Sequence, residues 1–266
     1  MLLVIDVGNT NTVLGVYDGD RLAESWRIHT NRSVTADEFN VLITGLFAGS
    51  RMEPGEVART IISSVVPPMV PILDGFCRRY LGHSPTWVDP RTYGGMPIRY
   101  SNPAEVGADR IVNAVAAYEK YGTALIVIDF GTATTFDAIS ARGEYLGGAI
   151  SPGIMISAEA LFQNASKLPR VELFSPPERV VGKDTAASIQ AGIIFGYAGL
   201  VEGMVQRMAG EMGAVRVVAT GGLAPLMAAV CPAIEAVEPD LTLEGLRIID
   251  ERGAGGAHAW PASDCR

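Results

Sequence analysis

The 266-residue sequence is poor in the residue types that build disulfides and transition-metal sites. Its three histidines are scattered, which gives little support to a zinc site or to a histidine-based catalytic triad. Its three cysteines are also far apart, odd in number and without metal-ligand spacing. They fit reduced thiols in a cytoplasmic protein: Cys77, Cys231 and Cys265.

Basic residues are in the minority, with 21 Lys and Arg against 29 Asp and Glu and a net charge of −8. A nucleic-acid groove needs clustered Lys and Arg, so we expect no nucleic-acid partner. The start of the chain lacks the positive region of a secretory signal. The most apolar later stretch, residues 191–201, is too short and Gly-rich to span a bilayer, so we expect no membrane association.

Several catalytic motifs are missing as well. No Gly-x-x-x-x-Gly-Lys-Ser/Thr loop occurs, because Pro177 stands where the first glycine before Gly182 and Lys183 should be. There is also no Gly-x-Gly-x-x-Gly after a strand, no His-Glu-x-x-His and no Gly-x-Ser-x-Gly. These absences argue against P-loop, Rossmann, zinc-protease and serine-hydrolase chemistry.

The chain does contain an internal repeat. Residues 2–17 (LLVIDVGNTNTVLGVY) consist of an apolar strand, an Asp, a Gly turn and a second strand, and residues 124–138 (ALIVIDFGTATTFDA) repeat this order. Two copies indicate two domains of one design. We expect an N-terminal domain over residues 1–120, a C-terminal domain over 121–252, and a disordered tail over 253–266.

The repeated segment suits phosphate and cation binding. Gly8 and Gly131 let the backbone pass close to a bulky anion. Asp6, just before the first glycine, could hold the Mg²⁺ that accompanies a nucleotide, since Mg²⁺ takes only one or two carboxylates. Four consecutive residues then offer hydrogen-bond donors to phosphate oxygens: Asn9, Thr10, Asn11 and Thr12. An ordinary β-hairpin would also place Asp and Asn at its turn, and one copy alone does not decide between the two.

Periodicity gives each half a similar plan. In the first half we expect strands in the hairpin and over 21–29, 60–66 and 86–88, with helices from the capping box at 35–38 to about 49 and over 69–81. This β-β-β-α-β-α-β order indicates a mixed sheet with helices packed on it. In the second half we expect strands over 124–129, 134–140, 145–150 and 215–220, and helices up to about 167, over 185–212 and over 243–251.

Two further segments are candidate site elements. Gly107, Asp109 and Arg110 lie where a helix begins, and together offer a close backbone approach, a base and a carboxylate binder. An Asp at this position is also a common helix cap. Gly221 and Gly222 follow a strand, at the end where open α/β sheets bind ligands, although a simple strand-to-helix turn would look the same. Small residues along 186–199 permit close approach of a partner subunit or of a neighbour in the same chain.

Four separated motifs, IDVGNTNTV, EVGADR, IDFGTATT and GKDTAASIQAG, resemble type III pantothenate kinase in order and spacing, over about residues 1–251. The resemblance implies the fold of actin, Hsp70 and sugar kinases. That fold is α/β, with two duplicated actin-like (ribonuclease H-like) domains, mixed five-stranded sheets flanked by helices, and a nucleotide cleft between the domains. It also implies a homodimer that phosphorylates pantothenate with ATP, the first step of coenzyme A biosynthesis, using Mg²⁺ and a monovalent cation, K⁺ or NH₄⁺.

The resemblance also implies residue roles. Asp109 is the base that takes the hydroxyl proton, Asp6 lies near Mg²⁺ and Asp129 is the ligand of the monovalent cation. Thr185 reaches the substrate from the neighbouring subunit, and pantothenate lies against Tyr100, Gly107, Ala108, Asp109 and Arg110. ATP lies against Thr132 and the loop formed by Asp6, Val7, Gly8, Asn9, Thr10, Asn11, Thr12 and Val13.

Two other functions stay open. One is another kinase or phosphatase of the same superfold, acting on a sugar, acetate or polyphosphate. The other is a non-catalytic ATP-binding member that serves as an accessory regulatory factor. The segment around Tyr100 and Gly107 to Arg110 argues against the first, and the acidic charge balance argues against direct DNA contact in the second.

Overall fold

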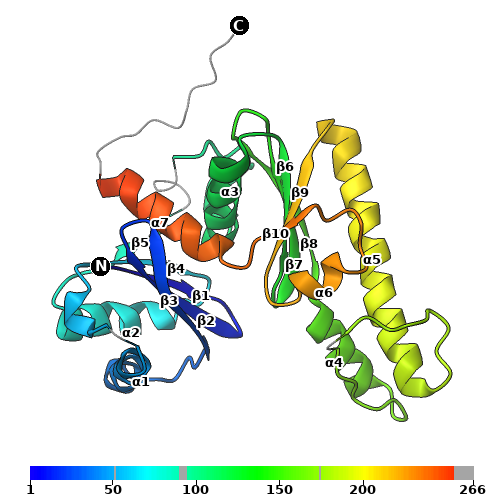
Figure 1. Ribbon diagram of the computed structural model, residues 1–266, viewed down its shortest axis with the longest axis horizontal. Helices are drawn as coiled ribbons and strands as arrows, with labels where there is room; N and C mark the ends of the chain where they lie inside the picture. The colour runs from blue at the N-terminus through cyan, green and yellow to red at the C-terminus, as the bar shows by residue number, and fades with distance from the viewer. Residues whose placement is uncertain (51, 90–94, 174, 255–266) are drawn as a thin grey trace, which may run out of the picture. The chain divides into compact units, whose positions relative to one another are not determined.

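The structure is a computed structural model that describes residues 1–50, 52–89, 95–173 and 175–254. The chain forms two compact units (Figure 1). The first contains Met1–Ala116 together with the chain from Leu241 onward, and the second contains Ala117–Asp240. Each unit is described by itself.

The first unit is built on a five-stranded mixed sheet in the order β3-β2-β1-β4-β5. The strand β1 lies in the middle, antiparallel to β2 and parallel to β4. Its apolar residues are buried on both faces, as expected for a central strand. The strands are β1 (Leu2–Val7), β2 (Asn11–Asp18), β3 (Arg21–His29), β4 (Arg59–Ser64) and β5 (Thr86–Trp87).

Helices cover both faces of this sheet. One face packs on α1 (Ala36–Ala48) and α2 (Met69–Phe76), which a π-helical turn continues over Cys77–Leu81. The helix α1 begins at the predicted capping box, in which Thr35 and Glu38 bond each other's backbone N–H. The other face packs on α7 (Leu241–Ala254), whose Leu243 contacts the β2 residue Gly15. Short 3₁₀ turns over Pro54–Glu56 and Pro103–Glu105 precede β4 and α3 (Ala108–Tyr121).

The second unit repeats the same sheet. Its order is β10-β9-β6-β7-β8, so β6, β7, β8, β9 and β10 correspond to β1, β2, β3, β4 and β5. Asp129 in β6 is therefore the equivalent of Asp6 in β1, and the two pair with neighbouring strands in the same way. The strands are β6 (Leu125–Phe130), β7 (Ala133–Ile139), β8 (Tyr145–Pro152), β9 (Arg216–Thr220) and β10 (Ala236–Val237).

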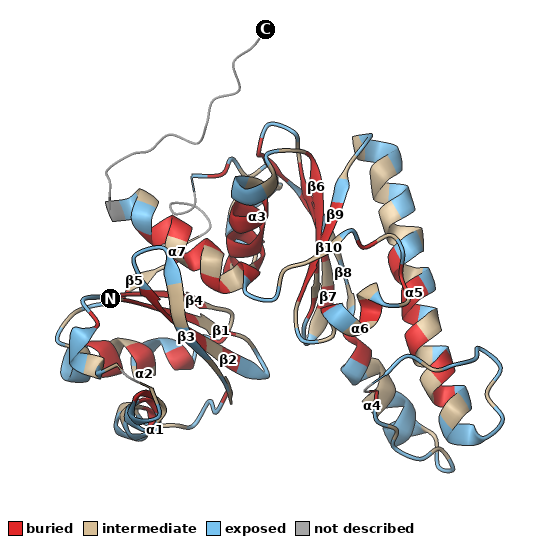
Figure 2. Cartoon of the chain, viewed as in Figure 1, coloured by how far each residue is buried: buried red, intermediate tan, exposed pale blue. Residues whose placement is uncertain are grey.

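Three helices pack against one face of the second sheet: α4 (Ile154–Asn164), α5 (Thr185–Met212) and α6 (Ala224–Ala228). With 28 residues, α5 is long and apolar enough by composition to cross a membrane, a property that core helices of globular proteins share. Figure 2 shows buried segments of α5 in red between exposed ones. Its buried residues Ile194 and Val201 pack in the core of the unit.

The predicted α/β plan with two repeated, mixed five-stranded sheets is confirmed. The division of the chain differs from the expected one at its last helix, because α7 packs on β1, β2 and β4 of the first unit. The expected disordered tail over 253–266 lies outside the described residues from residue 255 onward. Residues 253 and 254 belong to α7.

Candidate active site

The first glycine turn, between β1 and β2, is closed by hydrogen bonds on both sides. The Gly8 N–H donates to the Asn11 carbonyl at 3.0 Å, and the Gly8 carbonyl accepts from the Thr30 hydroxyl at 2.8 Å. The Thr30 hydroxyl also lies 2.9 Å from the hydroxyl of Thr12, which is buried. The Thr12 hydroxyl therefore helps to hold the β1–β2 turn in place through Thr30.

The tip of this turn faces outward. Asn9, Thr10 and Asn11 are exposed, so their polar groups are accessible to a ligand. Arg32, which follows β3, donates from Nη2 to Oδ1 of Asn9 at 2.9 Å. A guanidinium group beside a row of amide and hydroxyl groups suits an anionic ligand such as a polyphosphate.

Asp6 precedes the turn near the carboxyl end of β1. In the strand register it lies opposite Val13 of β2 and beside Ser63 of β4. The Ser63 hydroxyl is fully buried and has no hydrogen-bond partner within the described part of the chain. A buried hydroxyl next to a carboxylate can bind an ion or a water, and its side chain lies on the same face of the sheet as that of Asp6.

The corner formed by Gly107 to Arg110 lies at the same end of the sheet. The Val65 N–H donates to the carbonyl of Val7 at 3.1 Å, which places Val65 beside the end of β1. A Cβ on Gly107 would lie 3.7 Å from Cγ1 of Val65. The start of α3 therefore lies next to Val65, at the end of the sheet where the sequence-predicted phosphate loop follows β1.

Within this corner the Asp109 carboxylate is held close to the backbone. Its Oδ1 accepts from the Arg110 N–H at 2.8 Å and lies 2.5 Å from the position of a Cβ on Gly107. Burial raises the pKa of Asp109 above its ordinary value, and the bond from the Arg110 N–H and the charge of Arg110 oppose this only in part. A carboxylate with a raised pKa is a stronger base, which suits proton abstraction.

Two other residues of the expected substrate site, Ala108 and Arg110, flank Asp109 in the chain. Ala108 and Arg110 are buried, with 7% and 8% of their surface exposed, whereas Tyr100 is half-buried in the loop before the 3₁₀ turn. The largely buried guanidinium of Arg110 is a candidate carboxylate binder on the α3 side of the corner.

The second glycine turn, between β6 and β7, is one residue shorter than the first but is closed by an equivalent hydrogen bond. The Gly131 N–H donates to the Ala133 carbonyl at 3.1 Å, and Thr132 is exposed at the tip. A Cβ on Gly153, at the start of α4, would overlap the Thr132 carbonyl oxygen at 2.1 Å. Only glycine permits this close approach of α4 to the turn.

Asp129 lies between two glycine turns. Its Oδ1 is 3.6 Å from the position of a Cβ on Gly131 and 2.5 Å from that of a Cβ on Gly221, which has φ of 91°. The Phe130 carbonyl oxygen lies 2.7 Å from the same Gly221 position. The Asp129 Oδ1 atom and the Phe130 carbonyl oxygen thus both lie against the backbone of Gly221. They occupy the space that the side chain of any other residue at position 221 would need.

Thr185 is the first residue of α5 and is exposed. The preceding Asp184 caps the helix by accepting from the Ala187 N–H at 2.8 Å. Just before this cap, Val180 and Val181 are 67% and 70% exposed. These two valines form a small exposed apolar pair three residues before Asp184.

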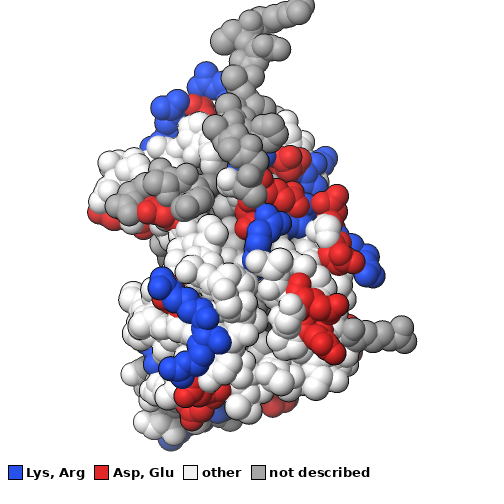
Figure 3. All heavy atoms as spheres, turned by 90° about the vertical axis from the view of Figure 1, so that its left-hand side faces the viewer, with Lys and Arg blue, Asp and Glu red and all other residues white. Residues whose placement is uncertain are grey.

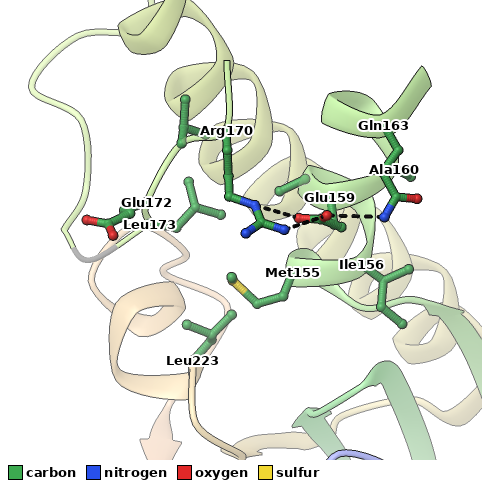
Figure 4. A pocket seen from close by; sticks show the side chains of 11 residues that line it. Met155, Ile156, Glu159, Ala160, Gln163, Arg170, Glu172, Leu173 and Leu223 are labelled. Carbon is green, nitrogen blue, oxygen red and sulfur yellow. Dashed lines mark hydrogen bonds and ion pairs between the residues drawn. The ribbon is translucent and has the colours of Figure 1, made fainter. Parts of the chain in front are cut away.

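A pocket of about 750 Å³ opens between α4, residues 170–173 of the connector between α4 and α5, and Leu223 (Figure 4). Its lining residue Leu223 follows the Gly221 turn, and its lining residue Met155 lies in the first turn of α4, which starts against the Thr132 turn. Arg170 lies at its edge, where it pairs with Glu159 through bonds of 2.6 and 3.0 Å. Most of the pocket lining is apolar, including Met155, Ile156 and Leu173.

The structure thus places the predicted residues in two groups. In the first unit residues 6–13 and residues 107–110 lie at the same end of the sheet, and in the second unit Asp129 lies beside the turn of Thr132. The expected convergence of both groups on one cleft stays a prediction. Arg32 and Ser63 were missed, because neither belongs to a motif. Their positions at strand ends beside the first glycine turn were the available signal.

Sequence comparisons place the chain among characterised protein families. Residues 2–207 match the family model described as type III pantothenate kinase. The protein of that name from Desulfatibacillum aliphaticivorans is 66% identical over 253 residues, which cover 95% of this chain and 98% of the relative. The one from Geobacter sulfurreducens is 56% identical over 253 residues, with 95% and 99% covered.

Structural comparisons find the same two-unit fold at low sequence identity. Component A of (R)-2-hydroxyglutaryl-CoA dehydratase from Acidaminococcus fermentans superposes with a TM-score of 0.53 and 16% identity, covering 92% of this chain and 94% of that one. The activator of 2-hydroxyisocaproyl-CoA dehydratase from Clostridium difficile, solved with bound ADPNP, gives 0.50 and 12%, with 96% of each chain covered. Because the family model matches residues 2–207 and the relative from Desulfatibacillum aliphaticivorans is 66% identical over 95% of this chain, the chain belongs to the type III pantothenate kinase family.

Proposed function

We propose that this protein transfers the γ-phosphoryl group of ATP to the primary hydroxyl of pantothenate, giving 4′-phosphopantothenate and ADP in the first step of coenzyme A biosynthesis. The observation that carries this proposal is the position of Asp109 in the Gly107–Arg110 corner, which lies next to Val65 at the end of the sheet where the glycine turn follows β1. A base and a phosphate loop at one sheet end are what this reaction requires.

In the proposed reaction Asp109 accepts the proton of the pantothenate hydroxyl. The hydroxyl oxygen forms a bond to the γ-phosphorus while the bond from that phosphorus to the β,γ-bridging oxygen breaks, and ADP leaves. The raised pKa of Asp109 makes its carboxylate a better acceptor for this proton. Tyr100 and the residues from Gly107 to Arg110 hold pantothenate, with the Arg110 guanidinium as a partner for its carboxylate.

ATP is assigned to the two glycine turns. The β1–β2 loop from Asp6 to Val13 and Thr132 bind its phosphates, and Arg32 adds a positive charge that the motifs alone did not indicate. In the second unit, we assign the adenosine group to the largely apolar pocket lined by Met155 and Leu223 (Figure 4). Apolar walls with a few polar groups are typical of nucleoside pockets.

The residues present fit the two cations that the family implies. Among the described residues no three His, Cys, Asp or Glu side chains cluster as in a transition-metal site. Asp6 alone is enough for Mg²⁺, which is bound mainly through water and phosphate oxygens and would neutralise charge on the phosphates. For K⁺ or NH₄⁺ we assign Asp129, beside the Phe130 carbonyl at Gly221.

We further propose a homodimer in which Thr185 of one subunit reaches the pantothenate site of the other. Thr185 is exposed at the start of α5, and Val180 and Val181 beside it are among the most exposed large apolar residues described. Apolar side chains also lie exposed on β8 and α4, including Ile150 and Phe162. Burial of these side chains would favour association.

The proposed location is the cytoplasm, where both substrates are soluble, and the proposed partners include neither nucleic acid nor membrane. On the face shown in Figure 3, Lys and Arg side chains are interspersed with Asp and Glu side chains. Together with the net charge of −8, this supports small-molecule substrates rather than DNA as the ligands of the protein.

The test is an ADP-release assay with ATP and Mg²⁺, run with pantothenate and with a panel of sugars, acetate and polyphosphate, in K⁺ and in Na⁺ buffers. We expect ADP release only with pantothenate, and faster in K⁺. Phosphorylation of another compound would favour the small-molecule kinase alternative. ATP binding without any phosphorylation would favour the non-catalytic regulatory alternative.

A further inference from the structure

The strand β7 carries a fully buried carboxylate that none of the roles above uses. Asp137 has none of its surface exposed. Its Oδ1 accepts from the Tyr145 hydroxyl at 2.7 Å and its Oδ2 accepts from the Thr135 hydroxyl at 3.2 Å. Burial of a carboxylate is costly, and apolar residues of similar volume often replace a buried charge without loss of stability. A role beyond packing would explain why an Asp stands here.

The register of the sheet connects this carboxylate to Asp129. Thr135 of β7 lies directly opposite Asp129 of β6 in the antiparallel pair, so their side chains lie on the same face. Asp137 is two residues further along β7 and therefore also lies on this face. Thr135 is thus placed between the two carboxylates.

The hydrogen bond to Asp137 sets the orientation of the Thr135 hydroxyl. Because Thr135 donates its single hydrogen to Asp137, the lone pairs of its oxygen are available to another partner. On the side of Asp129, Oδ1 of this residue and the Phe130 carbonyl already converge on Gly221. Carboxylate, carbonyl and hydroxyl oxygens are the ligands that hard cations take in proteins.

We propose that Thr135 is an oxygen ligand of the monovalent cation at Asp129, and that Asp137 and Tyr145 are positioning residues that hold its lone pairs toward the ion. This inference rests on the proposed assignment of the cation to Asp129. In this arrangement β7 contributes a ligand to the cation site in addition to β6. The buried pair of Asp137 and Tyr145 then serves to orient that ligand. Such partners typically change metal affinity 10- to 100-fold when they are removed.

The experiment measures cation binding through its effect on thermal stability, independently of catalysis. The melting temperature of the full-length protein is recorded against K⁺ concentration, with choline chloride keeping the ionic strength constant, in the absence and presence of ADP. The half-saturating K⁺ concentration follows from the ligand-induced stabilisation. For Thr135→Val we expect this concentration to rise at least tenfold, while Thr135→Ser, which keeps the hydroxyl, stays close to the wild-type value.

The adjacent Thr134 gives a matched control. Its side chain points to the opposite face of β7, is fully buried, and its hydroxyl has no hydrogen-bond partner in the described part of the protein. Thr134→Val should leave the half-saturating K⁺ concentration unchanged. For Asp137→Asn and Tyr145→Phe we expect a rise of about tenfold, because each leaves the Thr135 hydroxyl less firmly oriented. If Asp137→Asn does not fold, Tyr145→Phe tests the positioning role.

Asp129→Asn separates this inference from the proposed function. If K⁺ still stabilises Asp129→Asn as it does the wild type, the cation assignment itself is wrong and the inference fails with it. If Asp129→Asn loses the response while Thr135→Val keeps the wild-type half-saturating concentration, only the inference is overturned.

Discussion

The carboxylate of Asp129 occupies the space that a side chain on Gly221 would need. The Oδ1 atom lies 2.5 Å from the position of a Gly221 Cβ, closer than such an atom tolerates, and the Phe130 carbonyl oxygen lies at 2.7 Å. The two residues belong to β6 and to the turn after β9, whose strands pair in parallel. Position 221 therefore requires glycine for two reasons: the positive φ of the turn and the close approach of the Asp129 carboxylate.

We expect Gly221→Ala to destabilise the protein strongly and to remove its response to K⁺. The φ of 91° is unfavourable for Ala, and the new methyl group must displace the Phe130 carbonyl or the Asp129 carboxylate. Backbone strain and overpacking together cost about 3 kcal/mol. Urea denaturation measures the free energy of unfolding, and the K⁺ dependence of the melting temperature measures the cation site.

Gly122→Ala is the matched control for this change. Gly122 also has a positive φ, of 58°, but a Cβ there would meet nothing within 4 Å. The control should lose only the backbone contribution, about 1–2 kcal/mol, and keep the K⁺ response. Equal losses of stability in both variants would show that the contact between Asp129 and Gly221 has no energetic consequence.

A second glycine acts on the proposed base. For Gly107→Ala we expect kcat to fall by about tenfold to a hundredfold with little change in stability. A Cβ at Gly107 would lie 2.5 Å from Oδ1 of Asp109, which is the end of a side chain and can move away. The fold survives such a shift, whereas a misplacement of about 1 Å in a reacting group can cost a hundredfold in rate.

Kinetics and thermal unfolding of Gly107→Ala are compared with those of Gly45→Ala. Gly45 lies within α1, and a Cβ there has open space around it. The control should keep wild-type kcat and gain about 0.5–1 kcal/mol from the better helix former. Wild-type kcat in Gly107→Ala would argue against Asp109 as the base.

Local signals in the sequence predicted much of the fold. The Thr35–Glu38 capping box fixed the start of α1, because both of its hydrogen bonds form within four residues. The repeated hairpins predicted β1, β2, β6 and β7, and with them the equivalence of Asp6 and Asp129. These features depend on neighbours in the chain, which a single sequence displays.

The features that the sequence did not reveal depend on distant pairing. Arg32 reaches Asn9 across 23 residues, and Asp129 meets Gly221 only because β6 pairs with β9. The sequence predicted a helix over 243–251, but gave no indication that α7 would pack on the sheet of the first unit. Ser63 and Thr135 become candidate site residues only because the strand register places them beside Asp6 and Asp129, and the sequence does not reveal this register.

Arg32 provides a test of the phosphate loop. Arg32→Ala should raise the KM for ATP about three- to tenfold and leave kcat close to the wild-type value, because an exposed charged contact contributes about 1 kcal/mol to binding. Arg21→Ala removes the same charge at the other end of β3 and serves as the control. An equal change in the KM of both variants would mean that Arg32 acts only through net charge.

The raised pKa of Asp109 predicts that its removal has opposite effects on activity and stability. Asp109→Asn should lower kcat a hundredfold or more, since general-base catalysis typically contributes at least that much. At neutral pH the variant should unfold at the same or a higher temperature, because Asn avoids the cost of burying a charge. Steady-state kinetics and calorimetry test the two effects separately.

The pH dependence of stability follows from the same shift. Because the folded protein holds the Asp109 proton at a higher pH than the unfolded chain, the ionised carboxylate destabilises the fold at every pH above the raised pKa. This cost decreases as the pH falls through the raised pKa and disappears below the ordinary value of 3.8. The difference in unfolding free energy between Asp109→Asn and the wild type should therefore be largest near neutral pH and shrink on acidification. Urea denaturation at several pH values measures it, and a difference that grows toward low pH would contradict the burial of this carboxylate.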